Sequence, residues 1–144
     1  MIQTITVGTD GSDTADKAVE FAMGLAEKFG AKLVIASSYR PISEDKVRKE
    51  QRDAPEDIQW SINPTEDVDA ALRAVEQQAK ERGLEYVSEA RNGDPADVLC
   101  DIAADQEADV LVVGNKGMHR RILGSVPNSV SHKAPCSVVI VKTT

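Results

Sequence analysis

A short apolar run followed by a glycine-rich turn is the feature that most constrains this chain. Residues 109–113, Asp-Val-Leu-Val-Val, are β-branched and lack helical periodicity, which indicates a buried parallel strand. Glycines then follow, and Ser125 with Pro127 is typical of a helix start. The sequence therefore predicts a glycine loop between a strand's carboxyl end and a helix N-terminus. Such a loop suits an anion, because glycines allow close backbone approach and the first helical N–H groups lack partners.

The charge distribution supports an anion site in the same part of the chain. The net charge is −7, yet residues 110–144 contain no acidic residue. Their basic residues give +5, which leaves −12 for the first 109 residues. These basic residues are Lys116, Arg120, Arg121, Lys133 and Lys142. One basic island on an acidic protein favours a phosphate ligand over nucleic acid, which would require a broad basic face.

The composition fits one domain spanning residues 1–144. With 41% hydrophobic residues, the chain can bury a full core, and no linker or repeat divides it. No stretch is apolar enough to span a membrane, and no signal-like segment opens the chain. Cys100 and Cys136 lack metal-ligand spacing, so we expect two buried thiols. We therefore expect a soluble, cytoplasmic protein that binds neither membrane nor nucleic acid.

Apolar periodicity divides the chain into alternating strands and helices. Strands are expected at 4–7, 33–36, 85–90, 109–113 and 137–141. Helices are expected from Ser12 or Asp13 to Gly30, from Asn63 to Gly83, from Asp94 and Pro95 onward and from Ser125 to about His132. The residues expected to face inward are Ala15, Ala18, Val19, Ala22, Met23 and Ala26 in the first helix, and Val98, Leu99, Ile102 and Ala103 in the third. The polar segment 40–63 has no strand signal and is long for a connection, which is typical of a functional flap or of disorder.

The polarity of the third strand predicts the order of the sheet. Its only sizeable apolar residues are Tyr86 and Val87, so it belongs at an edge. Alternating strands and helices indicate a parallel sheet with right-handed crossovers, and the order 3-2-1-4-5 follows for a three-layer α/β sandwich. The topological switch point, where such sheets bind ligands, then lies between strands one and four. Both of these strands precede glycine turns, so topology and phosphate chemistry predict one crevice.

Three motifs resemble the universal stress protein family, the UspA-like proteins. They are Val7-Gly8-Thr9-Asp10-Gly11-Ser12, then Gly114-Asn115-Lys116-Gly117 with Leu123-Gly124-Ser125-Val126, and Ala134-Pro135-Cys136-Ser137. The resemblance covers the whole chain and is most specific in the last third, where ATP-binding members carry a G-x2-G-x9-G-[ST] pattern. It implies a flavodoxin-like or adenine nucleotide α-hydrolase-like domain that binds ATP or a related adenine nucleotide and forms homodimers through its last strand.

The resemblance also implies roles for individual residues. Asp10 would contact the ribose or a phosphate bridged by Mg²⁺, and main-chain groups near Ser37 and Ser38 would meet the adenine edge. The implied nucleotide-binding residues are Gly8, Thr9, Asp10, Ser37, Ser38, Gly114, Asn115, Lys116, Gly117, Met118, Arg120, Arg121, Gly124, Ser125 and Val126. Asp10 could instead serve only as a helix cap, since Asp is a preferred cap residue.

The glycine loop departs from the family pattern in length. Six residues, Met118 to Leu123, separate Gly117 from Gly124, where the pattern has nine. The shorter cradle favours a smaller ligand such as AMP or cyclic AMP, or a loop in which Arg120 and Arg121 replace lost backbone contacts with charge. The shortening could instead have removed binding.

The sequence contains no arrangement typical of nucleotide chemistry. Catalysis would need a base and usually a metal-holding carboxylate beside the phosphate cradle, and Asp10 is the sole carboxylate expected at the crevice. No Ser-His-Asp, HExxH or Walker lysine pattern is present. We therefore expect a nucleotide-binding regulatory module of stress physiology without catalytic residues. The alternatives are a slow ATPase or self-phosphorylating protein that uses Asp10 with a divalent ion, and a dimeric interaction module without a ligand.

The last strand predicts self-association. Its residues are Ser137, Val138, Val139, Ile140 and Val141, which carry no charge. At the sheet edge they would expose unpaired N–H and C=O groups, which soluble proteins cover or pair. No other segment is available to cover them, so we expect the same strand of a second copy to pair across a two-fold axis.

Overall fold

The computed structural model describes residues 1–39, 64–115 and 125–143. Within these ranges, strands and helices alternate along the chain. The elements are β1 (Thr4–Gly8), α1 (Asp13–Phe29), β2 (Lys32–Tyr39), α3 (Pro64–Glu81), β3 (Tyr86–Asn92), α4 (Pro95–Asp105), β4 (Val110–Gly114), α6 (Ser125–Lys133) and β5 (Ser137–Val141). The polar connection 40–63 lies outside the described residues. No helix in the described ranges is long and apolar enough to cross a membrane.

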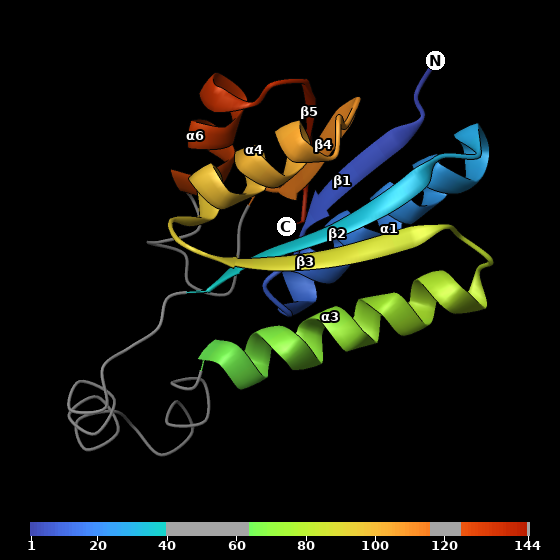
Figure 1. Cartoon of the computed structure of the whole chain (residues 1–144), viewed down its shortest axis with the longest axis horizontal. Helices are drawn as coiled ribbons and strands as arrows, with labels where there is room; N and C mark the ends of the chain where they lie inside the picture. Colours follow the sequence, from blue (N-terminus) through green and yellow to red (C-terminus); the bar gives the residue numbers. More distant parts are fainter. Residues whose placement is uncertain (40–63, 116–124, 144) are drawn as a thin grey trace.

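The sheet has the strand order that the sequence predicts. The order is β3-β2-β1-β4-β5, and all neighbouring strands pair in parallel. Val7 of β1 lies between Ile35 of β2 and Val112 of β4. Figure 1 shows α4 and α6 on one side of the sheet, and the buried clusters place α1 and α3 on the other. The switch point therefore falls between β1 and β4, as expected from the order.

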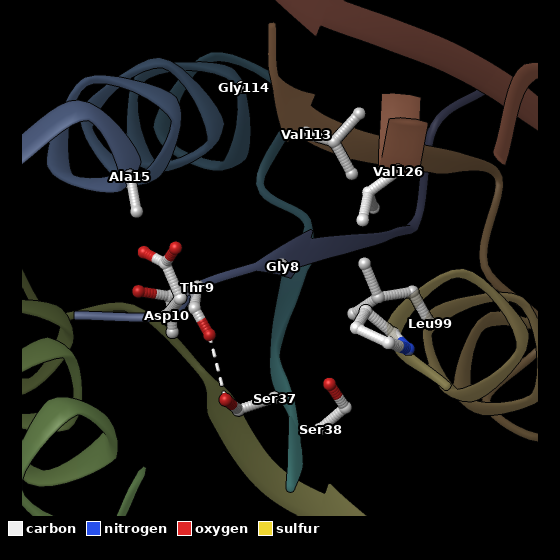
Figure 2. A pocket seen from close by; sticks show the side chains of 11 residues that line it. Gly8, Thr9, Asp10, Ala15, Ser37, Ser38, Leu99, Val113, Gly114 and Val126 are labelled. Carbon is white, nitrogen blue, oxygen red and sulfur yellow. Dashed lines mark hydrogen bonds between the residues drawn. The ribbon is translucent and has the colours of Figure 1, made fainter. Parts of the chain in front are cut away.

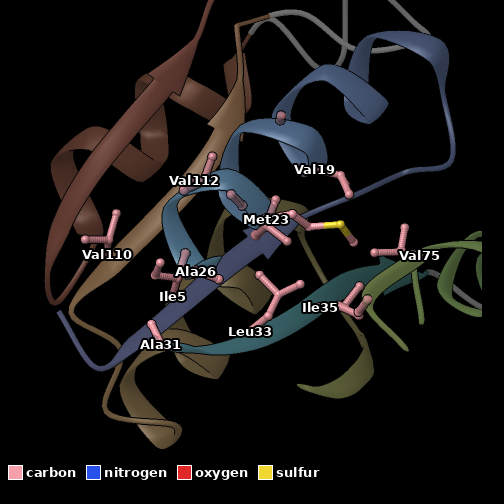
Figure 3. Close-up of a cluster of buried hydrophobic side chains, with 14 of the residues drawn as sticks. Ile5, Val19, Met23, Ala26, Ala31, Leu33, Ile35, Val75, Val110 and Val112 are labelled. Atoms are coloured by element: carbon pink, nitrogen blue, oxygen red, sulfur yellow. The ribbon is translucent and has the colours of Figure 1, made fainter. Parts of the chain in front are cut away.

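Each face of the sheet carries its own hydrophobic core. Figure 3 shows Val19 and Met23 of α1 among the buried side chains of the first face, together with Leu33 of β2. The residues that α1 buries are those predicted from periodicity, Ala15, Ala18, Val19, Ala22, Met23 and Ala26. On the second face, Ile102 of α4 belongs to the other cluster. Cys100 is buried there but Cys136 is only half-buried, so the expectation of two buried thiols was wrong for Cys136.

The ends of α1 follow from local chemistry. The Ser12 hydroxyl accepts a hydrogen bond from the N–H of Ala15 at 3.1 Å, which makes Ser12 the N-cap. Gly30 ends the helix in the left-handed region with φ 63°, a conformation that glycine adopts without strain. Ser12 therefore begins α1 directly beyond the carboxyl end of β1, and Gly30 ends it.

β2 is longer than the sequence predicts. The strand continues through Ser37 and Ser38, which pair with Ala90 and Arg91 of β3. Two polar residues do not signal a strand end here, because β3 supplies the hydrogen-bonding partners. Both serines are therefore held on a regular strand at the edge of the switch point.

Candidate functional site

A cavity of about 90 Å³ lies at the carboxyl ends of the central strands. It is lined by the ends of β1, β2 and β4, by the turn after β1, and by the first turns of α1, α4 and α6 (Figure 2). The lining residues are Gly8, Thr9, Asp10, Ala15, Ser37, Ser38, Pro95, Leu99, Val113, Gly114 and Val126. Because three helices begin at this edge of the sheet, the positive ends of their dipoles favour a negatively charged ligand here.

Thr9 is held rigidly on one side of the cavity. Its N–H donates to the carbonyl of Ala36 at 2.9 Å, and its own carbonyl accepts from the Ser37 hydroxyl at 2.7 Å. Figure 2 shows this second bond joining the turn after β1 to β2. The Thr9 hydroxyl accepts from the N–H of Gly11 at 3.2 Å. These bonds fix the turn that presents the next residue, Asp10, to the cavity.

Asp10 supports the cap of α1 but is not the cap itself. Its Oδ1 accepts from the Ser12 N–H at 3.0 Å and from the Ser12 hydroxyl at 2.5 Å. The alternative that Asp10 caps the helix is therefore wrong, because Ser12 has that role. The other carboxylate oxygen of Asp10, Oδ2, has no partner among the described residues, which leaves it free to accept from a ligand.

The opposite wall of the cavity is apolar. Leu99 of α4 and Val113 of β4 are buried, and Val126 of α6 is half-buried. Pro95 adds a ring from the first turn of α4. The cavity thus has a hydrophobic wall suited to a flat ring and, across from it, a polar wall of Thr9, Asp10 and Ser38. This division is typical of sites that hold a small molecule by its apolar body and orient it by a few polar groups.

Negative charge gathers at the start of α1. Burial raises the pKa of Asp16, and the neighbouring carboxylates of Asp13 and Asp10 raise it further. In the part of the chain that the structure describes, no group of three or more His, Cys, Asp or Glu residues is arranged to hold a metal ion.

Asn115 points away from the cavity toward the end of the chain. Its N–H donates to the carbonyl of Val141 at 2.9 Å, and its Oδ1 accepts from both the N–H and the hydroxyl of Thr143, at 2.8 and 2.7 Å. Thr143 is 2% exposed, and its carbonyl accepts from Lys17 Nζ at 3.0 Å. The Asn115 side chain therefore joins the end of β4 to Thr143, just beyond β5, and it does not line the cavity.

The structure brings together most of the predicted residues that it describes. Gly8, Thr9, Asp10, Ser37, Ser38, Gly114 and Val126 all line the cavity, whereas Asn115 does not. Ser125 begins α6, but its side chain lies outside the described part. Lys116, Gly117, Met118, Arg120, Arg121 and Gly124 also lie outside the described residues.

Comparison with known proteins identifies the family. The model of the universal stress protein family matches residues 1–142. The chain belongs to the universal stress protein family. Universal stress protein Rv1636 of Mycobacterium tuberculosis is 39% identical to it over 99% of this chain and 97% of the relative.

Solved structures of universal stress proteins share the fold. The crystal structure of a universal stress protein in complex with cAMP is 35% identical, covers 99% of both chains and has a TM-score of 0.74. A family protein from Arabidopsis thaliana with AMP bound is 19% identical, has a TM-score of 0.71 and covers 99% of this chain and 92% of its own. The predicted family and the predicted universal stress protein fold are confirmed.

Four residues that line the cavity of this universal stress protein were missed as site residues, namely Ala15, Pro95, Leu99 and Val113. Leu99 was expected to face the core, which it does, but its position near the helix N-terminus also brings it to the cavity. Pro95 was expected only to start a helix. The strand and helix order indicated that Leu99 and Pro95 lie near the site, because a helix that follows a parallel strand begins at the carboxyl edge of the sheet.

Proposed function

We propose that this universal stress protein binds an adenine nucleotide, AMP, cyclic AMP or ATP, in the cavity at the switch point. Two observations together carry the proposal, one from a relative and one from this chain. A relative that aligns over 99% of both chains at 35% identity was crystallised in complex with cAMP. In this chain the motif residues that resemble the family's nucleotide site surround one cavity.

The two walls of the cavity suggest how the ligand would lie. Pro95 and Leu99 of α4 offer a surface for the adenine ring, and the hydroxyl of Ser38 points toward the cavity from β2 (Figure 2). The Oδ2 of Asp10, which has no partner among the described residues, would accept from a ribose hydroxyl. Phosphates would then lie toward Gly114 and the N-terminus of α6, where the backbone dipoles favour negative charge.

The basic residues of the glycine segment would complete the phosphate site. We propose that Lys116, Arg120 and Arg121 hold the phosphates together with Gly117, Met118, Gly124 and Ser125, and that the shortened loop makes the arginines more important than backbone donors. Asn115 would contribute through its link to Thr143. Mg²⁺, where ATP brings it, would neutralise phosphate charge, with Asp10 as its indirect partner.

We propose a regulatory role for the site instead of catalysis. Among the described lining residues, Asp10 is the one carboxylate, and none of these residues is a histidine, cysteine or lysine that could act as a base. Binding would instead report nucleotide concentration to the rest of the molecule. The assembly through which nucleotide binding would act is a homodimer, since β5 is an edge strand whose Ile140 side chain is 46% exposed.

Native mass spectrometry of the purified protein tests the proposal. We expect retained AMP or ATP, or uptake of added AMP or cyclic AMP with one nucleotide per chain. Retained ADP that accumulates from added ATP would favour the slow ATPase over the binding module. A protein that retains nothing and takes up none of the three nucleotides would contradict the proposal.

A further inference from the structure

Both phenylalanines of this chain lie exposed on one helix. The chain contains two, Phe21 and Phe29, and they are 45% and 46% exposed on α1. The residues that α1 turns into the core are mostly alanines, so this helix has its smallest side chains inside and its largest apolar ones outside. Leu25 lies between them at the i, i+4, i+8 spacing that forms one row along a helix. We refer to Phe21, Leu25 and Phe29 as the phenylalanine stripe.

Two polar contacts show which way the stripe faces. Lys17 precedes Phe21 by one turn in the same row, and its Nζ donates to the carbonyl of Thr143, just beyond β5, at 3.0 Å. On the other flank of α1, Glu20 pairs with Arg82, at the end of α3, at 3.0 Å. The stripe therefore faces the β5 edge of the sheet, on the flank of α1 that is turned away from α3.

The surface between the stripe and the sheet edge is also apolar. Val139 and Val141 of β5 pack against the core on the α1 face, as does Leu25, and all three remain only half-buried. β5 itself is the last strand of the sheet. The stripe and these two valines thus form one apolar surface that ends at an unpaired strand edge.

We propose that the phenylalanine stripe meets the stripe of a second copy of this chain. The two stripes would form the part of a homodimer interface that lies on the α1 face of the sheet. This inference rests on the β5 pairing proposed above and adds a second contact to it. Antiparallel pairing of two β5 strands requires a two-fold axis perpendicular to the sheet. Such an axis leaves the α1 face of the sheet on the same side in both copies. The two α1 helices therefore lie on one side of the joined sheet, with their stripes facing each other.

The spacing explains why the stripe contains aromatic residues. α1 packs chiefly on β1 and β4, about two strand spacings from such an axis. With strands ~4.8 Å apart, the two α1 helices would lie about 19 Å apart, well beyond the 8–10 Å at which helices pack directly. Only long side chains reach across such a gap. The rings of Phe21 and Phe29 would fill it above Val139 and Val141 of both copies.

The area that a stable dimer must bury also supports a role for the stripe. Stable protein interfaces bury about 1,200–2,000 Å² in total. Each β5 strand contributes five residues, of which only Val138, Val139, Ile140 and Val141 are apolar. A pair of such short strands falls below that range, whereas two phenylalanines from each copy add large apolar surfaces.

Sedimentation of the full chain tests the inference with a matched control. Phe21→Ser combined with Phe29→Ser removes the aromatic rings from an exposed surface and should leave the fold intact. We expect it to raise the dimer dissociation constant by about tenfold or more, because interface energy concentrates in large aromatic residues. Val87→Ser is the control, since Val87 is 36% exposed on β3 at the opposite edge, and we expect no change in association. Calorimetry should show that both variants still bind AMP, with Val87→Ser at the affinity of the parent.

The outcomes separate this inference from the β5 pairing. If the double phenylalanine variant dimerises as tightly as the parent while Ile140→Lys gives monomers, the stripe is not part of the interface and only this inference fails. If the unmodified chain is monomeric at micromolar concentration, the proposed dimer fails, and the inference fails with it.

Discussion

The side chain of Leu99 fills the space that a side chain on Gly8 would need. A Cβ on Gly8 would lie 2.8 Å from Leu99 Cδ1, closer than such atoms approach in folded proteins, and 3.1 Å from Cδ2, which is tighter than most such contacts. The missing side chain at the end of β1 therefore lets α4 pack directly against the sheet. Leu99 also lines the cavity, so this contact sets how deep the apolar wall of the site lies.

Gly8→Ala should lower the free energy of unfolding by about 1 kcal/mol, the low end of the usual effect of overpacking a core, because the contacted atoms are the flexible end of Leu99. The added methyl group would push Leu99 toward the cavity. Urea denaturation would measure the loss. In a Leu99→Ala background the methyl group has room, so the effect of Gly8→Ala should nearly disappear. Equal losses in both backgrounds would show that Leu99 is not the cause.

The neighbouring serines of β2 should have different roles, Ser37 in stability and Ser38 in ligand binding. Ser37 is 2% exposed, and its hydroxyl donates to the Thr9 carbonyl at 2.7 Å. Ser37→Ala would leave that carbonyl without its side-chain donor and should lower the free energy of unfolding by about 1–3 kcal/mol. Ser38→Ala removes a half-buried hydroxyl that points toward the cavity, so stability should stay within about 0.5 kcal/mol of the parent.

The same pair distinguishes stability from binding. Loss of one hydrogen bond to the ligand is worth about 0.5–1.5 kcal/mol, so Ser38→Ala should weaken AMP binding roughly two- to tenfold. Calorimetry on both folded variants checks this. Unchanged AMP affinity in Ser38→Ala would place the ligand away from the end of β2.

Asp109 should make stability depend on pH at the acidic end. Its Oδ2 accepts from the N–H groups of Gln3 and Thr4 at 2.7 and 3.0 Å, and these bonds lower the pKa of Asp109. A lowered pKa in the folded state means that the ionised carboxylate stabilises the fold. This contribution is complete above the ordinary value of about 3.9 and is lost as the pH falls through the folded-state pKa.

Asp109→Asn should therefore be less stable than the parent at pH 7, with a gap that narrows below about pH 4. Urea unfolding across this range measures the gap. A gap that stays constant or widens in acid would show that the charge of Asp109 does not matter.

Arg120 and Arg121 should discriminate between ligands with and without phosphate. A charge-assisted hydrogen bond is worth about 1.5–3 kcal/mol, so losing one such contact should weaken ATP binding roughly ten- to a hundredfold, and reversing both charges should weaken it at least as much. Adenosine, which lacks phosphate, should lose much less. Calorimetry with both ligands makes the comparison, and an equal loss would mean that the arginines do not contact phosphate.

The fold was predictable because each level of the sequence pointed to the same answer. The sparse apolar residues of β3, Tyr86 and Val87, placed that strand at an edge, and the strand order followed. Local chemistry predicted Gly30 as the end of α1 and limited its N-cap to Ser12 or Asp13, of which the structure has Ser12. The glycine turns after β1 and β4 located the cavity, since topology dictates which strand ends meet.

The remaining features depend on contacts between distant parts of the chain. Asn115 belongs to a glycine motif, yet its side chain binds Thr143, a partner that no local pattern indicates. Periodicity showed that Leu99 faces inward but not that its inward face also borders a cavity. The exposure of Phe21 likewise depends on which helix flank the neighbouring elements cover.

The central claim is that an adenine nucleotide binds at the switch point, and calorimetric titration of the purified protein with AMP, cyclic AMP and ATP tests it most directly. The matched variant is Gly114→Val, which adds a branched side chain to a residue that lines the cavity at the end of β4. Val87→Ser, on the far edge of the sheet, is the control. We predict that the parent and the control bind at least one of the three nucleotides with one site per chain, and that folded Gly114→Val loses most of that affinity. Absence of binding to all three by the parent, or undiminished binding by Gly114→Val, would contradict the account.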